Sequence, residues 1–230
     1  MFSLVAGFMR QCLAKPEANI LILGLDYAGK TTLLEQMKGL FKRTPGIPPD
    51  KIPPTVGLNV TKMSIFGCTV TFWDLGGQLK MRSLWSHYFE DAHGLVFVID
   101  SADVGRFEEA KLAFDSMMEE GGQTHGIPTL LLANKQDLPD ACTEAEISQL
   151  FGVSQEFLLD HAFRLQPISA LTRCRKMPCS KLVIPCMSTL TTPLFVQRTI
   201  PSTFPCRIIS LTSVPCLTQG RHLRGYPMDC

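Results

Sequence analysis

The sequence lacks any apolar run close to the roughly 20 residues that a membrane-spanning helix needs. Its N-terminus also lacks the charged segment, long apolar core and small-residue cleavage site of a secretory signal. No internal repeat or long low-complexity run is present, which argues against solenoid and propeller folds. Residues 1–172 contain few cysteines, namely Cys12, Cys68 and Cys142, and these are too widely separated to suggest a disulfide framework. We therefore expect a cytosolic protein with reduced thiols.

A strong net charge is also absent, because 22 basic residues nearly balance 21 acidic ones. This balance argues against a strongly basic nucleic-acid binder, so no nucleic-acid partner is expected. The two signs are unevenly distributed, however. Residues 1–172 hold 14 bases and 20 acids, whereas residues 173–230 hold 8 bases, 1 acid, six of the nine cysteines and seven of the sixteen prolines. The composition predicts a body followed by a tail of a different kind.

Short apolar runs alternate with segments of helical periodicity along the body. Strands are predicted at 19–23, 59–65, 69–73, 94–99, 128–133 and 163–168, with a tight hairpin at 66–68. Helices are predicted over 31–41 and 107–120, and a capping box of Thr143 with Glu146 predicts another helix that begins there. This alternation predicts an α/β fold with a doubly wound, mostly parallel sheet that binds ligands at the carboxyl ends of its strands.

The segment after the first predicted strand fits G-x-x-x-x-G-K-[ST] and precedes a predicted helix. Glycines in this motif let backbone N–H groups close around phosphate oxygens, and the helix N-terminus adds a positive dipole. Lys30 is expected to reach the β- and γ-phosphates, and the Thr31 hydroxyl to bind Mg²⁺. The predicted phosphate-binding residues are Gly24, Leu25, Asp26, Tyr27, Ala28, Gly29, Lys30, Thr31 and Thr32.

A second motif, Trp73-Asp-Leu-Gly-Gly-Gln78, begins at the end of a predicted strand. Asp74 is placed where a carboxylate can hold Mg²⁺. Gly77 has no side chain to block an N–H that reaches a γ-phosphate. Gln78 stands where an amide orients the attacking water, a positioning role because an amide scarcely takes a proton. Gln78 is therefore the predicted catalytic residue.

A third motif, Asn134-Lys-Gln-Asp137, follows the strand at 128–133. The Asp137 carboxylate suits the N1–H and 2-amino donors of guanine, which adenine does not offer at those positions. Lys135 is expected to lay its stem over the base, and the segment Ser169, Ala170 and Leu171 to offer a backbone N–H to the guanine O6. The motifs predict GTP or GDP with Mg²⁺ as cofactors, and they disfavour an ATP-dependent phosphotransferase.

These motifs, together with Pro54-Thr-Val-Gly-Leu-Asn-Val60, Leu84-Trp85 and His87-Tyr-Phe89, resemble the Arf family of small GTPases up to about Thr172. Within the family, the chain is similar to the Arf-related proteins of the trans-Golgi or to a divergent Arf-like member. The resemblance implies a small GTPase fold of the P-loop type. It also implies that Thr55 joins Thr31 and Asp74 around Mg²⁺ in the GTP state and that Gly77 contacts the γ-phosphate.

The resemblance further implies a switch in vesicle and Golgi membrane traffic that moves between the cytoplasm and the Golgi surface. An exchange factor, a GTPase-activating protein and effectors are the implied partners, and a monomer is expected. No arginine is placed by a motif to act in cis. Because a missing arginine finger costs roughly 10³ to 10⁵ in rate, intrinsic GTP hydrolysis is expected to be slow.

Residues 1–17 have apolar positions at helical spacing, which predicts an amphipathic helix. The resemblance implies that this helix enters the membrane in the GTP form; the alternative is a helix packed permanently on the domain. Position 2 is Phe2 rather than the glycine that N-myristoylation requires. Membrane affinity is therefore expected from the helix itself or from a receptor.

The resemblance ends near Thr172, so the predicted GTPase domain spans 18–172 and the tail spans 173–230. Seven prolines in the tail exclude the final helix of the family, and we expect the tail to be disordered. Because composition changes at a motif boundary and no new pattern replaces it, a translated intron or a shifted reading frame is the favoured origin of this segment. The corresponding alternative function is a nucleotide-free or misfolded variant that acts at most as an interaction protein.

Overall fold

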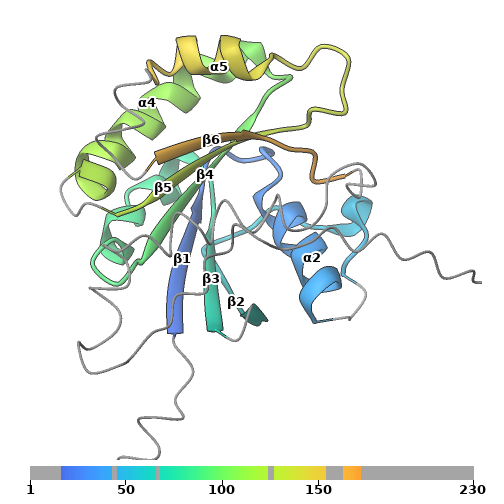
Figure 1. The fold of residues 1–230 in the computed structure, drawn as a ribbon, viewed down its shortest axis with the longest axis vertical. Coiled ribbons are helices and arrows are strands. Elements are labelled where there is room, and N and C mark those ends of the chain that lie inside the picture. Colours follow the sequence, from blue (N-terminus) through green and yellow to red (C-terminus); the bar gives the residue numbers. More distant parts are fainter. Residues whose placement is uncertain (1–16, 43–45, 66–67, 124–126, 154–162, 172–230) are drawn as a thin grey trace, which may run out of the picture.

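A computed structural model describes residues 17–42, 46–65, 68–123, 127–153 and 163–171 (Figure 1). The predicted amphipathic helix at 1–17, apart from Glu17, lies outside the described residues. Most of the predicted hairpin turn at 66–68 and the whole tail at 173–230 also lie outside the described residues. The expectation that the tail forms no final helix therefore stays a prediction.

Six strands form one sheet in the order β2-β3-β1-β4-β5-β6 (Figure 1). They are β1 (Glu17–Leu23), β2 (Leu58–Ile65), β3 (Cys68–Leu75), β4 (Gly94–Asp100), β5 (Thr129–Asn134) and β6 (Phe163–Pro167). Among the described strands, β2 and β3 pair antiparallel, and the other neighbouring strands are parallel. The predicted mostly parallel α/β sheet is therefore confirmed, and each predicted strand is present within two residues of its predicted bounds.

The helices are α2 (Lys30–Phe41), α3 (Leu79–Arg82), α4 (Phe107–Met117) and α5 (Glu144–Leu150), with 3₁₀ turns η1 (Pro49–Lys51), η2 (Trp85–Tyr88) and η3 (Val104–Arg106). The predicted helix at 107–120 ends earlier as an α-helix, at Met117, and continues as a π-helical turn, η4 (Met118–Gln123). Gly121 and Gly122 lie in that turn, and glycine is a poor α-helix former. Within the described residues, no helix has the length and apolarity to span a bilayer.

The predicted capping box is present at the start of α5. The Thr143 hydroxyl accepts a hydrogen bond from the Glu146 N–H at 3.4 Å, and the Glu146 carboxylate accepts one from the Thr143 N–H at 2.7 Å. Such a reciprocal pair satisfies two backbone donors that the helix itself leaves unpaired.

The sheet is buried on both faces, since α4 and α5 cover one side and α2 covers the other (Figure 1). Alternate residues of β1 enter the two cores. Leu21 and Leu23 pack on the α4 side, and Ile20 and Ile22 pack on the α2 side. Strands buried on both faces require continuous rather than alternating apolar runs, which is the pattern that predicted them.

The parallel strands place their following loops at one edge of the sheet. The P-loop, residues 24–29, follows β1; residues 76–78 follow β3; and residues 135–137 follow β5. The β1–β3 and β4–β5 registers bring these strand ends level with one another. The three motifs, which are about 110 residues apart at their extremes, therefore meet at the carboxyl edge, where doubly wound sheets bind ligands.

Candidate nucleotide-binding site

The P-loop passes very close to two other segments, and glycine is required at both places. A Cβ on Gly24, which has φ +132°, would lie 2.2 Å from the Val98 carbonyl oxygen of β4. A Cβ on Gly29, which has φ +93°, would lie 2.3 Å from the side-chain nitrogen of Asn134. The loop can therefore pack directly over the strand ends, and α2 begins immediately after it with an N-cap residue, Gly29, that makes no side-chain capping hydrogen bond.

A cavity of about 300 Å³ lies between the P-loop, the loop before β2 and the segments after β3, β5 and β6. Most of the predicted site residues line it: Asp26, Tyr27, Gly29, Lys30, Thr31, Thr32, Thr55, Gly77, Gln78, Asn134, Lys135, Asp137, Ala170 and Leu171. Gly24, Leu25, Ala28, Asp74 and Ser169 do not line it, but each is hydrogen-bonded to a residue that does. The structure therefore brings all of the predicted residues to one place.

Lys30 is buried beneath the cavity, and its ammonium group donates hydrogen bonds to the carbonyls of Gly24 at 3.0 Å and Leu25 at 2.7 Å. Burial lowers the pKa of Lys30 to about 8, although the nearby carboxylates of Asp74 and Asp26 raise it. The buried cation is only partly compensated by the protein. Phosphate oxygens in the cavity would supply the missing negative charge.

Three oxygen-bearing side chains from separate segments meet beside Lys30. The Thr31 hydroxyl donates to Asp74 Oδ2 at 2.7 Å and lies 2.6 Å from the Thr55 hydroxyl. Because Thr31 has a single hydroxyl hydrogen, Thr55 is the donor in the second contact. Thr31 comes from α2, Asp74 from β3 and Thr55 from the loop that precedes β2.

The Asp74 carboxylate is fully buried, and its Oδ1 atom accepts no hydrogen bond from the part of the chain that the structure describes. Burial raises the pKa of Asp74, against the hydrogen bond from Thr31 and the charge of Lys30, which lower it. A cation beside this carboxylate would stabilise its charged form. Hydroxyl and carboxylate oxygens are ligands that a hard divalent ion prefers, so the residues present fit a magnesium ion.

Asn134 joins two loops of the site. Its side-chain N–H donates to the Ala28 carbonyl at 2.7 Å, and its side-chain oxygen accepts from the Ala170 N–H at 2.9 Å. Only 1% of the residue is exposed. The sequence placed Asn134 among the nucleotide-binding residues, and its contacts in the structure are to the P-loop and the loop after β6.

Lys135 and Asp137 of the third motif line the cavity. Ser169 donates a hydrogen bond to Asp137 at 2.5 Å, and the Lys135 ammonium group pairs with Asp100 at 2.5 Å. The Gln136 N–H donates to the Ile168 carbonyl at 3.1 Å, which holds the loop after β6 beside the loop after β5. The predicted base-binding residues are therefore neighbours.

Gly77 lies against the P-loop, where a Cβ would be 2.3 Å from the backbone nitrogen of Asp26. The preceding residue, Gly76, donates its N–H to the Gly57 carbonyl at 2.9 Å and accepts from the Trp85 indole at 3.3 Å. Gln78 follows as an exposed residue that lines the cavity. The segment that carries both predicted residues is thus tied to the loop of Thr55 on one side and to the P-loop on the other.

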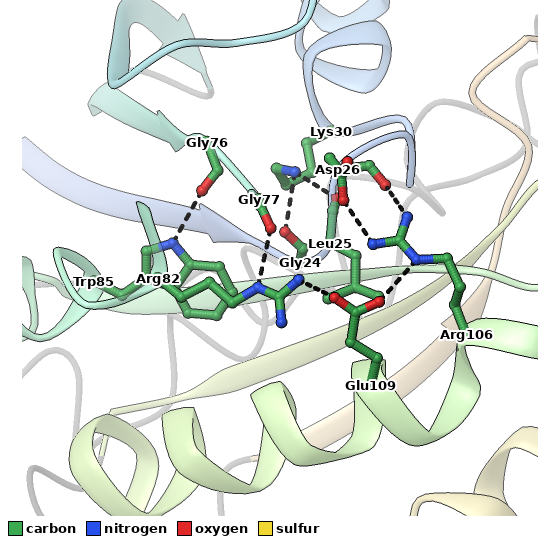
Figure 2. Close-up of polar contacts among 10 residues, drawn as sticks. All are labelled: Gly24, Leu25, Asp26, Lys30, Gly76, Gly77, Arg82, Trp85, Arg106 and Glu109. Atoms are coloured by element: carbon green, nitrogen blue, oxygen red, sulfur yellow. Dashed lines mark hydrogen bonds and ion pairs between the residues drawn. The ribbon is translucent and has the colours of Figure 1, made fainter. Parts of the chain in front are cut away.

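Two groups near the site were not identified from the sequence. The loop before β2 carries no phosphate motif, yet four of its residues line the cavity: Pro49, Ile52, Pro53 and Pro54. Arg82 and Arg106 form ion pairs with acidic residues beside the P-loop (Figure 2). The only local signal was the spacing of Arg106 and Glu109 on one helical face, which is common on solvated helices.

A glycine-rich loop between a strand and a helix, a buried lysine beneath it and a converging threonine and aspartate define a P-loop nucleotide-binding protein of the small GTPase class. The chain belongs to the ADP-ribosylation factor (Arf) family, whose sequence pattern matches residues 5–181. The matched range continues past residue 172, where the predicted domain ends.

Relatives and a solved structure agree with this assignment. The chain is 40% identical over 173 residues to the ADP-ribosylation factor-related protein 1 of Bos taurus, covering 75% of this chain and 86% of that protein. It is 40% identical over 177 residues to the ADP-ribosylation factor-like protein 3 of Saccharomyces cerevisiae, with the same coverage of 75% and 86%. The structure of the Arl6 BBS3 small GTPase from Trypanosoma brucei, with the bound nucleotide analogue GppNp, is 26% identical with a TM-score of 0.63. The match covers 75% of this chain and 97% of that one.

As a member of this family, the chain is a small GTPase: it binds guanine nucleotide, hydrolyses GTP and acts as a switch that regulators and effectors recognise. The expectation of a GTP-hydrolysing enzyme is confirmed.

Proposed function

We propose that this GTPase holds its nucleotide together with Mg²⁺ in the cavity at the carboxyl edge of the sheet and hydrolyses GTP slowly. The observation that carries this proposal is the convergence of Thr31, Thr55 and Asp74 beside Lys30. Two hydroxyls from distant segments meet at a buried carboxylate, and this set of oxygen atoms suits a divalent cation.

Thr31, Thr55 and Asp74 are the residues that would hold the magnesium ion. When bound, the ion neutralises negative charge on the phosphate oxygens. Lys30 places its charge beside the β- and γ-phosphates, and the P-loop from Gly24 to Gly29 surrounds them with backbone N–H groups. Thr32 continues the first turn of α2 at the edge of the cavity.

Guanine recognition falls to the segments after β5 and β6. Asp137 accepts hydrogen bonds from the guanine N1–H and 2-amino groups, and Lys135 covers the base with its stem. Within the segment Ser169, Ala170 and Leu171, the Ala170 N–H donates to Asn134, so the backbone N–H available to the guanine O6 is that of Ser169 or Leu171. A site built on such bonds rejects a base that lacks the donors by roughly 10⁴ to 10⁵, which favours GTP over ATP.

Hydrolysis depends on Gln78, which orients the attacking water, while the Gly77 N–H contacts the γ-phosphate. No arginine is among the described residues that line the cavity, which supports slow intrinsic turnover. Activation by a partner protein is therefore part of the proposal, as is an exchange factor that promotes release of GDP.

The switch consists of two segments that face the γ-phosphate: switch I, the loop before β2 that carries Thr55, and switch II, residues 76–82. The Gly76 N–H bond to the Gly57 carbonyl joins them at 2.9 Å. Contacts of Thr55 and Gly77 with the nucleotide order both segments, and hydrolysis releases them.

The cellular role that we propose is the regulation of vesicle and Golgi membrane traffic by a monomer. The chain moves between the cytoplasm and the Golgi surface and binds membrane peripherally through residues 1–17. The family membership and the relation to ADP-ribosylation factor-related proteins support this role. In cells, a fluorescently labelled full-length chain should localise to Golgi membranes, and removal of residues 1–17 should release it into the cytoplasm. A full-length chain that never localises to the Golgi would contradict the proposal.

Thermal melting of the full-length protein tests the nucleotide proposal. With Mg²⁺, GDP or a non-hydrolysable GTP analogue at 100 times its dissociation constant should stabilise the fold by about 2.7 kcal/mol, and ATP should not. Omission of Mg²⁺ should reduce the shift with the GTP analogue. If no nucleotide raises the melting temperature, or if no cooperative transition occurs, the alternative of a nucleotide-free variant replaces the switch. The same comparison with a chain cut after Thr172 shows whether the tail affects folding.

A further inference from the structure

Two arginines and two acidic residues form a continuous series of ion pairs beside the P-loop (Figure 2). They come from separate segments: Asp26 from the P-loop, Arg106 from η3, Glu109 from the first turn of α4 and Arg82 from α3. We call these four side chains the arginine relay. The relay connects the loop that surrounds the phosphates with the segment that carries Gln78.

Glu109 is at the centre of the relay, because each of its carboxylate oxygens pairs with a different arginine. Arg106 Nε donates to Glu109 Oε2 at 2.8 Å, and Arg82 Nη2 donates to Glu109 Oε1. The other side of the Arg106 guanidinium holds the P-loop, with Nη2 on Asp26 Oδ1 at 2.6 Å and Nη1 on the Asp26 carbonyl at 3.2 Å. A planar guanidinium suits such divided pairing, since it presents several donors in a fixed geometry.

Arg82 also reaches the backbone of switch II. Its Nε donates to the Gly77 carbonyl at 3.0 Å, and only 14% of the Arg82 side chain is exposed. That carbonyl belongs to the planar peptide that joins Gly77 to Gln78, so its orientation determines the direction in which Gln78 leaves the P-loop contact. Gly77 and Asp26 lie close together, and each is held by one arginine: Arg82 bonds to Gly77 and Arg106 bonds to Asp26.

We infer that Arg82 is a positioning residue for GTP hydrolysis, which holds Gln78 through the Gly77 carbonyl, with Glu109 and Arg106 as its anchor on the P-loop. The inference rests on the proposed role of Gln78 in orienting water. Arg82 is not an arginine finger. Its guanidinium is hydrogen-bonded to Gly77 and Glu109, and Arg82 is not among the described residues that line the cavity.

Glu109 and Arg106 keep their charges throughout the pH range of a hydrolysis assay. Hydrogen bonds from Arg106 and Arg82 lower the pKa of Glu109 to about 2, and the hydrogen bonds of Arg106 to Glu109 and Asp26 raise the pKa of that arginine above its usual value. The effect of Arg82 on hydrolysis should therefore not depend on pH near neutrality.

The test is single-turnover hydrolysis of bound GTP by the full-length protein with Mg²⁺, alongside the affinity for GDP. Arg82→Gln should slow hydrolysis about tenfold and leave GDP affinity within about twofold, because Gly77 and Gln78 face the γ-phosphate that GDP lacks. Glu109→Gln should slow hydrolysis similarly, since Arg82 loses its anchor. Glu108→Gln, a change at the exposed neighbouring residue of the same helix turn, is the matched control and should leave the rate unchanged.

A double-mutant cycle separates positioning from a purely structural role. In a Gln78→Ala background, Arg82→Gln should change the rate by less than about twofold, because the residue that Arg82 positions is no longer there. An additional tenfold loss in that background overturns the inference, and so does a normal rate in Arg82→Gln alone, while the proposed function stands. If Gln78→Ala hydrolyses GTP as fast as the wild type, the proposed role of Gln78 fails first and the inference fails with it.

Discussion

Among the polar residues of the site that touch neither the phosphates nor the metal, we expect substitution of Asn134 to destabilise the protein most. It accepts from the Ala170 N–H at 2.9 Å and donates to the Ala28 carbonyl at 2.7 Å, in a place where 1% of the residue is exposed. Asn134→Ala removes both bonds and leaves two buried backbone groups without partners. At about 1–3 kcal/mol for each unsatisfied group, the cost is about 2–6 kcal/mol, a large part of a typical total stability of about 5–15 kcal/mol.

Urea denaturation without nucleotide measures this cost, and the dissociation constant for GDP measures its effect on the site. We expect a weakened affinity for GDP as well, because the P-loop and the loop after β6 are no longer held together. Asn134→Asp is a nearly isosteric variant that keeps the bond from Ala170 but places an acceptor against the Ala28 carbonyl. It should destabilise the protein at least as much as the alanine variant.

Gln136→Ala is the control, since it removes a single bond of 2.9 Å from a partly buried side chain to the Cys142 carbonyl. It should cost less than about 1.5 kcal/mol. The reasoning is refuted if Asn134→Ala loses no more stability than this control, or if Asn134→Asp is as stable as the wild type.

Three further predictions concern single residues. His93 accepts a hydrogen bond from the Asn19 N–H at 3.1 Å through Nδ1, and burial lowers the pKa of His93 from its usual value of 6.5. The neutral imidazole therefore contributes stability that is fully present above pH 6.5. This stability is lost as the pH falls through the lower pKa of His93 in the folded state. Between pH 7.5 and 5.5 the wild type should lose more thermal stability than His93→Gln, and equal losses would exclude this cause. Tyr27 is a non-glycine residue at φ +62° that is 73% exposed. Because asparagine tolerates a positive φ better than tyrosine does, Tyr27→Asn should raise the free energy of unfolding in urea by about 0.5–1 kcal/mol. A decrease would show that packing of the tyrosine ring stabilises the fold. Asp137→Asn replaces an acceptor with a donor and should weaken GDP binding about 100-fold or more in a fluorescence titration, and an unchanged affinity would remove Asp137 from the base site.

The local patterns of the sequence predicted much of the architecture. Continuous aliphatic runs predicted strands buried on both faces, and β1, β4 and β5 have that character because helices cover each side of the sheet. The P-loop was also predictable from the sequence, since Gly24 and Gly29 have positive φ values and leave no room for a Cβ atom. The end of α4 was less predictable, because the chain continues after Met117 as a π-helical turn that contains two glycines.

What the sequence by itself determined is the chemistry available at the strand ends: phosphate-binding glycines, a lysine, hydroxyl and carboxylate oxygens and a guanine-type motif. Residue type and spacing are enough for this, because each motif carries its chemical groups within a few neighbouring residues. Only the tertiary structure decided which side chains serve one another. Arg106 reaches Asp26 across 80 residues, and Asn134 reaches Ala28 across 106, because the parallel order of β1, β4 and β5 brings their loops together. Such pairings depend on strand order and helix packing, which act over the whole domain, so a contact like the arginine relay exists only once the sheet has formed.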